Sequence, residues 1–149
     1  TWPPLSDTAP AASTGARSGA CLPWREREDA VSRESGKIGE DAAVKFLRRQ
    51  GFEIIERNYR GSRYEVDIIA REAGVLSFIE VKTRAPGRSL SGAEAVGREK
   101  QRRIAQAAQH YLMTHPGESS SVCRFDVVLL EAEAGGKPKA KALIRDAFQ

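Results

Sequence analysis

The stretch from Tyr64 to Arg84, Y-E-V-D-I-I-A-R-E-A-G-V-L-S-F-I-E-V-K-T-R, decides the fold of this chain. Two runs rich in β-branched and aromatic residues flank the four residues 71–74, R-E-A-G. Such runs on either side of a short turn that contains glycine are typical of a β-hairpin. We therefore predict two antiparallel strands, joined by a turn centred on Glu72 and Ala73.

The predicted hairpin gathers acidic side chains on one face of the sheet. Because side chains alternate between the faces of a strand, Glu65 and Asp67 share a face of the first strand, and Phe78, Glu80 and Lys82 share a face of the second. With this turn, Asp67 lies opposite Phe78, and Glu65 lies opposite Glu80. Asp67 and Glu80 are then diagonal neighbours, about 7–8 Å apart at the backbone and within joint reach of one metal ion.

These carboxylates need a compensating cation, because like charges that face one another across a sheet are destabilising. Lys82 supplies one positive charge, and a divalent metal ion would supply more. Oxygen ligands without an accompanying Cys or His favour Mg²⁺ or Mn²⁺ over zinc. The alternative is a solvent-exposed edge hairpin that carries an ordinary glutamate–lysine pair, and composition alone does not decide between the two.

Motifs along the chain resemble a known family. Asp67, twelve intervening residues and then E-V-K at Glu80 are similar to the D…E-x-K core of the restriction-endonuclease-like nucleases. Further motifs occur in order: G-x-x-G-E-D-x-A at Gly36, R-N-Y-R at Arg57, E-V-D-I-I-A at Glu65, F-I-E-V-K-T-R at Phe78, K-Q-R-R-I at Lys100, R-F-D-V at Arg124 and D-A-F at Asp146. From Ser35 to the C-terminus this pattern resembles the YraN-like family of small bacterial proteins. Tyr64 is a departure, since it stands where that family usually has Gly.

The resemblance implies a divalent-metal-dependent nuclease that hydrolyses phosphodiester bonds in DNA. The lack of an obvious sequence-reading module favours a branched or single-stranded substrate. Asp67 and Glu80 would hold Mg²⁺ or Mn²⁺ with the Val81 carbonyl oxygen, and Lys82 would position a water and stabilise developing negative charge. Glu40 would support the metal. Glu40 lies at the edge of the apolar stripe of a predicted helix, where a rim residue is the commoner interpretation. The resemblance favours a site residue, since related nucleases often bring an acidic residue from this helix to the metal.

Basic and polar side chains near this predicted site would contact the nucleic-acid backbone without reading its sequence. They come from the turn before the hairpin, the end of the E-x-K strand and the start of a later helix: Arg60, Arg63, Arg84, Lys100, Gln101 and Arg103. Two arginines on a turn are also an ordinary solvent-exposed feature. The resemblance further implies a homodimer, since small relatives of this fold that cleave four-way junctions work as dimers. The rival hypothesis is a non-catalytic nucleic-acid-binding module on the same fold.

The remaining elements predict the architecture. We expect a helix over 35–50 with Ser35 as N-cap, a strand over 51–60, a loop over 85–92, a helix over 93–113 interrupted near Gly97, and strands over 122–132 and 141–148. In that last part Arg124 and Asp126 are expected to order the sheet. This order predicts an α/β domain with a mixed central sheet of about five strands flanked by helices, and the resemblance implies a restriction-endonuclease-like core.

Bulk properties set the remaining expectations. At 149 residues, with a net charge of +4, the chain is long enough for one domain, and its mildly basic character permits a polyanionic partner. The Ala-, Ser-, Gly- and Pro-rich residues 1–34 read as a disordered extension ahead of a domain over 35–149. Two distant cysteines fit no disulfide or metal framework. The sequence contains no apolar run long enough for a membrane span and no signal-peptide pattern, so we expect a cytoplasmic location without a membrane partner.

Overall fold

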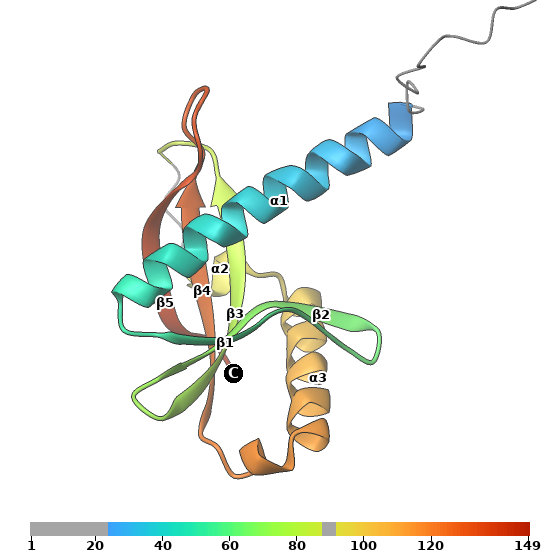
Figure 1. Ribbon diagram of the computed structural model, residues 1–149, viewed down its shortest axis with the longest axis vertical. Coiled ribbons are helices and arrows are strands. Elements are labelled where there is room, and N and C mark those ends of the chain that lie inside the picture. Colours follow the sequence, from blue (N-terminus) through green and yellow to red (C-terminus); the bar gives the residue numbers. More distant parts are fainter. Residues whose placement is uncertain (1–23, 88–91) are drawn as a thin grey trace, which may run out of the picture.

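A five-stranded β-sheet forms the middle layer of the protein, and helices cover both of its faces (Figure 1). The computed structural model describes residues 24–87 and 92–149, with the backbone alone for 24–33 and 92–93. The elements in chain order are α1 (Trp24–Arg49), β1 (Glu53–Gly61), β2 (Tyr64–Glu72), β3 (Val75–Arg84), α2 (Gly92–Ala95), α3 (Arg98–Thr114), the 3₁₀ turn η1 (Pro116–Glu118), β4 (Cys123–Glu131) and β5 (Lys139–Phe148).

The strands lie in the sheet in sequence order, β1-β2-β3-β4-β5. Three neighbouring pairs are antiparallel, whereas β3 and β4 are parallel because α2 and α3 carry the chain back across the sheet between them. The prediction of an α/β domain with a mixed sheet of five strands is confirmed. So is the interruption near Gly97, which separates α2 from α3.

Each face of the sheet carries its own apolar core. Phe78 and Ile69 pack with residues of α3 such as Ile104 and Tyr111. On the opposite face, residues of β2, β3 and β4 pack with Leu47 and its neighbours on α1. The alternation of buried side chains along β2 and β3 therefore serves two helix layers at once, which explains why both strands are rich in large apolar residues.

The hairpin turn lies one residue further along the chain than predicted. Ala73 and Gly74 both have positive φ angles, 49° and 83°, as a two-residue type I′ turn requires. Glu72 then pairs with Val75, and the ladder runs back to Ile68 and Ile79. The predicted register, with Asp67 opposite Phe78 and Glu65 opposite Glu80, is therefore wrong. One further step of the observed register places Asp67 opposite Glu80, so the two carboxylates are direct rather than diagonal neighbours.

The predicted start of the first helix is also wrong. Ser35 is not an N-cap, because α1 begins at Trp24 and continues to Arg49, and its N-terminal part extends beyond the sheet (Figure 1). The expected extension over 1–34 lies outside the described residues up to position 23 and stays a prediction there. In the described part of the chain, none of the helices combines the length and the apolar character needed to cross a membrane.

Candidate active site

Glu80 is the buried carboxylate at the centre of the candidate site. It lies in the middle of β3, and its side chain is only 3% exposed. Lys82 Nζ lies 2.9 Å from Glu80 Oε1, and Lys100 Nζ on α3 lies 3.3 Å from Glu80 Oε2. Both ammonium groups are about one-third exposed and reach solvent, at 33% and 36%. The structure therefore brings together a charge that is costly to bury and two cations that offset this cost.

Asp67 faces Glu80 from the neighbouring strand β2. Its Oδ2 atom accepts a hydrogen bond of 2.8 Å from the backbone N–H of Val81. Burial, and then the negative charge of Glu80, raise the pKa of Asp67 from its ordinary 3.8 to about 7, against the opposing effects of the Val81 N–H and Lys100. The two carboxylates are thus close together, and Glu80 is the one that forms ion pairs with the two lysines.

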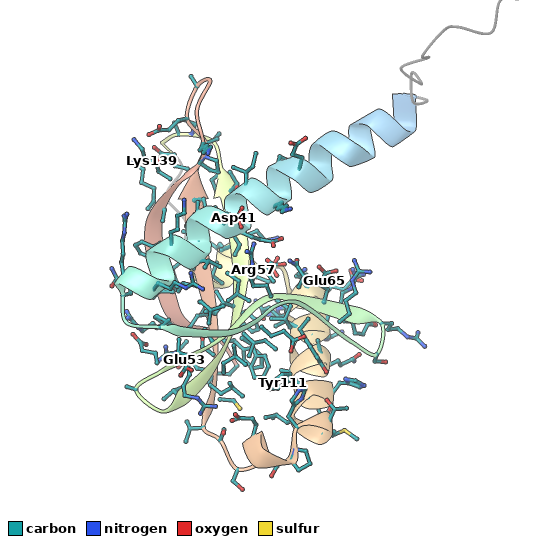
Figure 2. All side chains as sticks on the ribbon, viewed as in Figure 1. Asp41, Glu53, Arg57, Glu65, Tyr111 and Lys139 are labelled. Carbon is teal, nitrogen blue, oxygen red and sulfur yellow. The ribbon has the colours of Figure 1, made fainter. Side chains whose placement is uncertain are left out.

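Glu40 comes close to this pair without joining it. Its Oε2 atom accepts a 2.8 Å hydrogen bond from Asn58 Nδ2, and Arg57 Nη2 lies 3.5 Å away. Arg57 also donates to Asp41 Oδ1 at 2.7 Å, so α1 and β1 are tied together where they cross (Figure 2). The negative charge of Glu40 still contributes to the raised pKa of Asp67.

The carboxylates of the site fit a divalent metal ion in part. Within 34–87 and 94–149, no three His, Cys, Asp or Glu residues gather in a group that could hold a metal ion. The predicted trio of Asp67, Glu80 and Glu40 is therefore not assembled, because Asn58 and Arg57 hold the Glu40 carboxylate. Asp67 and Glu80 remain together, and the buried Glu80 Oε2 makes no hydrogen bond with any described residue. A pair of carboxylates fits Mg²⁺, which keeps several of its waters and takes few protein ligands.

The predicted nucleic-acid-binding side chains divide into two groups. Lys100 alone contacts the carboxylate pair. The remaining residues have other partners: Gln101 Nε2 donates to the Val96 carbonyl, Arg84 to the Ala95 carbonyl, Arg103 to Glu99, and Arg60 to Glu65. Arg63 is exposed on the turn between β1 and β2. Of the predicted nucleic-acid-binding side chains, Lys100 is therefore the one that the structure brings to the carboxylates.

Asn58 is a site residue that sequence reasoning missed. It has a positive φ angle of 52°, a left-handed conformation in which asparagine is among the better tolerated residues after glycine. This backbone turns its side-chain amide to Glu40, which is 18 positions away in the sequence. The R-N-Y-R motif marked the segment, but nothing in the motif indicates the conformation or the partner.

A second charged cluster, at the start of β4, is structural. Asp126 is fully buried, and its carboxylate accepts hydrogen bonds from Arg124, from Ser77 and from the backbone N–H of Asp146. Hydrogen bonds from Arg145 and Arg124 lower the pKa of Glu72 to about 2 despite partial burial. The cluster is fully paired, which agrees with the expectation that Arg124 and Asp126 order the sheet.

Comparison with known proteins agrees with the motifs. Residues 39–130 match the uncharacterised protein family UPF0102. A UPF0102 protein from Symbiobacterium thermophilum is 45% identical over 118 residues, which are 79% of this chain and 98% of that protein. A UPF0102 protein from Synechococcus sp. is 43% identical over 111 residues, 74% of this chain and 84% of the relative. The matched range contains Glu40, Asp67, Glu80, Lys82 and Lys100.

Proposed function

This chain belongs to the UPF0102 family, the YraN-like proteins, and we propose that it is a divalent-metal-dependent nuclease with a restriction-endonuclease-like core. Its substrate would be a phosphodiester bond in nucleic acid, DNA rather than RNA. The observation that carries the proposal is the pair formed by Asp67 and Glu80. Their two carboxylates face each other on adjacent strands. One buried oxygen of Glu80 has no hydrogen-bond partner among the described residues, and two lysines lie beside this carboxylate.

The chemistry follows from the charges of these groups. Asp67 and Glu80 would hold Mg²⁺ or Mn²⁺, which supplies polarisation of the scissile phosphate and a lowered pKa of a bound water. Lys82 contacts Glu80 and has about one-third of its side chain in solvent, so its ammonium group can orient a water at the edge of the pair. Lys100 approaches the same carboxylate from α3 and is placed to hold a phosphate oxygen and to stabilise developing negative charge.

Glu40 has a supporting role in this proposal. Since its carboxylate is bonded to Asn58, it is suited to hold a water between α1 and Asp67 rather than to bind the metal directly. Arg60, Arg63, Arg84, Gln101 and Arg103 lie outside this inner group and would contact the backbone of the nucleic acid. A homodimer and a cytoplasmic location remain expectations from the sequence.

A panel of end-labelled substrates tests the proposal: linear duplex, single-stranded, flapped and four-way-junction DNA, and a single-stranded RNA, each with Mg²⁺, Mn²⁺ or EDTA. The wild-type protein should cleave at least one DNA substrate with metal and none in EDTA. Lys82→Ala should lower the rate at least ~100-fold, as does the loss of one group that stabilises the transition state.

Lys141→Ala is the matched control. Lys141 also lies on a strand and pairs with a glutamate, Glu131, at 3.1 Å, but it belongs to β5 and is 57% exposed. This variant should cleave at the wild-type rate. Equal cleavage by the Lys82→Ala and wild-type proteins, or no cleavage of any substrate, would refute the proposal.

A non-catalytic nucleic-acid-binding module is the second candidate. It is favoured by one observation, that Lys82 and Lys100 already neutralise Glu80 while no third acidic ligand joins the pair among the described residues. Binding without cleavage, with an affinity that falls steeply between ~50 and ~200 mM salt, would support this candidate.

A further inference from the structure

Tyr64 lines a surface cavity at the start of the strand that carries Asp67. It is the first residue of β2, is half-buried, and lines a cavity of about 300 Å³ together with residues of the β1–β2 turn. The guanidinium carbon of Arg103, on α3, lies 5.9 Å from the centre of the Tyr64 ring. An aromatic ring that has an arginine above it and an open cavity beside it can hold a flat, electron-rich ligand.

The cavity beside Tyr64 borders a second cavity, and the two together are called the groove. Arg60 and Glu65 line both this cavity and a neighbouring one of about 570 Å³ that reaches Glu40. Tyr64 and Asp67 are three residues apart on one strand, a distance of about 10 Å along the backbone. The ring is therefore close to the carboxylate pair along the strand.

The charges along the groove suit a polyanion. The charged residues that line its two parts are four basic and two acidic ones: Lys37, Arg57, Arg60, Arg63, Glu40 and Glu65. Arg60 is 80% exposed and is tied to Glu65 only at the surface, at 3.2 Å, so it can exchange this partner for a phosphate at little cost.

We propose that Tyr64 is a base-stacking site for single-stranded nucleic acid, with Arg60 and Arg63 on the adjacent phosphates and Arg103 covering the ring. This inference rests on the proposed function and specifies its substrate class. An aromatic side chain within a basic groove is the arrangement that binds unpaired bases without sequence preference. A base within a duplex is already stacked on both faces, so Tyr64 selects for strands whose bases are free.

Binding in EDTA tests the inference without requiring cleavage. Fluorescence anisotropy would measure the affinity of the protein for four ligands: a single-stranded DNA of about 20 nucleotides, an RNA of the same sequence, an abasic DNA of the same length and a blunt duplex. The wild-type protein should bind the DNA strand, the RNA strand or both at least about fivefold more tightly than the abasic strand, because stacking is lost with the bases. This comparison uses the unchanged protein, so it does not depend on the folding of a variant.

Variants then assign the effect to Tyr64. Tyr64→Leu should weaken binding of the preferred single strand about tenfold and that of the abasic strand less than twofold, whereas Tyr64→Phe keeps the ring and should bind like wild type. Thermal melts of both variants report on folding. Equal affinity for normal and abasic strands, or an equal loss on both in Tyr64→Leu, would overturn the inference.

The binding assay tests the stacking site, and the cleavage panel tests the proposed nuclease, so the failure of one can be told from the failure of the other. One result would be cleavage that depends on metal and Lys82 while the normal and abasic strands bind with equal affinity. This result would support the nuclease and refute the stacking site. Base-dependent binding by Tyr64 without any cleavage would do the reverse. A protein that binds none of the four ligands overturns the stacking site, while the cleavage panel decides the nuclease.

Discussion

Replacing Asp67 by Asn should stabilise the metal-free protein at neutral and alkaline pH. The pKa of the Asp67 carboxyl is raised to about 7 in the folded protein, chiefly by burial and then by Glu80, from an ordinary 3.8. Ionised Asp67 therefore opposes folding. Asparagine removes the charge, keeps the shape, and retains an oxygen that can accept the 2.8 Å hydrogen bond from the Val81 N–H.

The magnitude follows from the pKa. Since a tenfold change in an ionisation equilibrium corresponds to about 1.4 kcal/mol, moving a pKa from 3.8 to about 7 costs the folded protein about 4 kcal/mol when the group is fully ionised. Asp67 is only half-buried, so solvent screening reduces this cost, and we expect about 2 kcal/mol. For a chain of 149 residues this corresponds to a rise in melting temperature of about 4–8 °C.

The destabilisation by Asp67 should increase as the pH rises. Well below pH 4 the carboxyl is protonated in both the folded and the unfolded states, so Asp67 costs nothing. The cost develops as the pH rises from about 4 and is complete above about 7, because the unfolded chain ionises first. The advantage of Asp67→Asn over wild type should therefore be near zero at pH 4 and largest at pH 8.

Urea unfolding at pH 4, 6 and 8 in EDTA would measure this difference. Asp41→Asn is the control, because it is the same chemical change at a carboxylate that is 49% exposed and paired with Arg57. It should change the free energy of unfolding by less than about 1 kcal/mol at any of these pH values. A difference between Asp67→Asn and wild type that stays constant from pH 4 to 8 would refute the electrostatic reasoning.

Two further changes test the surroundings of the site. Asn58→Gly keeps the positive φ angle but removes the 2.8 Å bond to Glu40, so cleavage should fall at least ~10-fold with the melting temperature nearly unchanged; full activity would show that the bond has no role. Gly61→Ala would put a Cβ atom 2.8 Å from Tyr59 Cε1 and should lower the free energy of unfolding by about 1–3 kcal/mol. Gly36→Ala is the control, because Gly36 lies within α1 and a Cβ atom there has nothing within 4 Å. This change should raise the free energy of unfolding by up to about 1 kcal/mol. An equal decrease of the free energy of unfolding in both variants would contradict the packing argument.

The sequence predicts the hairpin well and its register poorly. The alternation of side chains from Tyr64 to Arg84 indicates two strands, and the structure confirms both. Their register depends on which two residues form the turn, and a shift of the turn changes which side chains face one another. Ala73 takes a left-handed conformation that is unusual for alanine, so residue preferences did not indicate the turn of Ala73 and Gly74.

Helical periodicity is informative where a helix covers the sheet and uninformative where it does not. Lys100, which was expected near the site at the start of a later helix, precedes the apolar stripe of α3 and contacts Glu80. The start of α1 at Trp24 was missed, because Trp24–Arg33 carry no apolar stripe and that part of the helix extends beyond the sheet (Figure 1). The bond between Glu40 and Asn58 depends on tertiary packing and could not be predicted from either segment.

Lys100 changes how the charges of the site balance. From the sequence, Lys82 was the one cation beside several carboxylates, which predicts a strongly repulsive apo site. With Lys100 Nζ at 3.3 Å from Glu80 Oε2, the formal charges of Asp67, Glu80, Lys82 and Lys100 sum to zero when all four are ionised. A neutral group of this kind has little attraction for phosphate, whereas a divalent cation added to it leaves an excess of two positive charges. Metal and nucleic acid should therefore favour each other's binding, and by the same factor in either order. The neutral balance also explains why Asp67 is the better position for a stability test, since Glu80→Gln would leave two lysines without their shared partner.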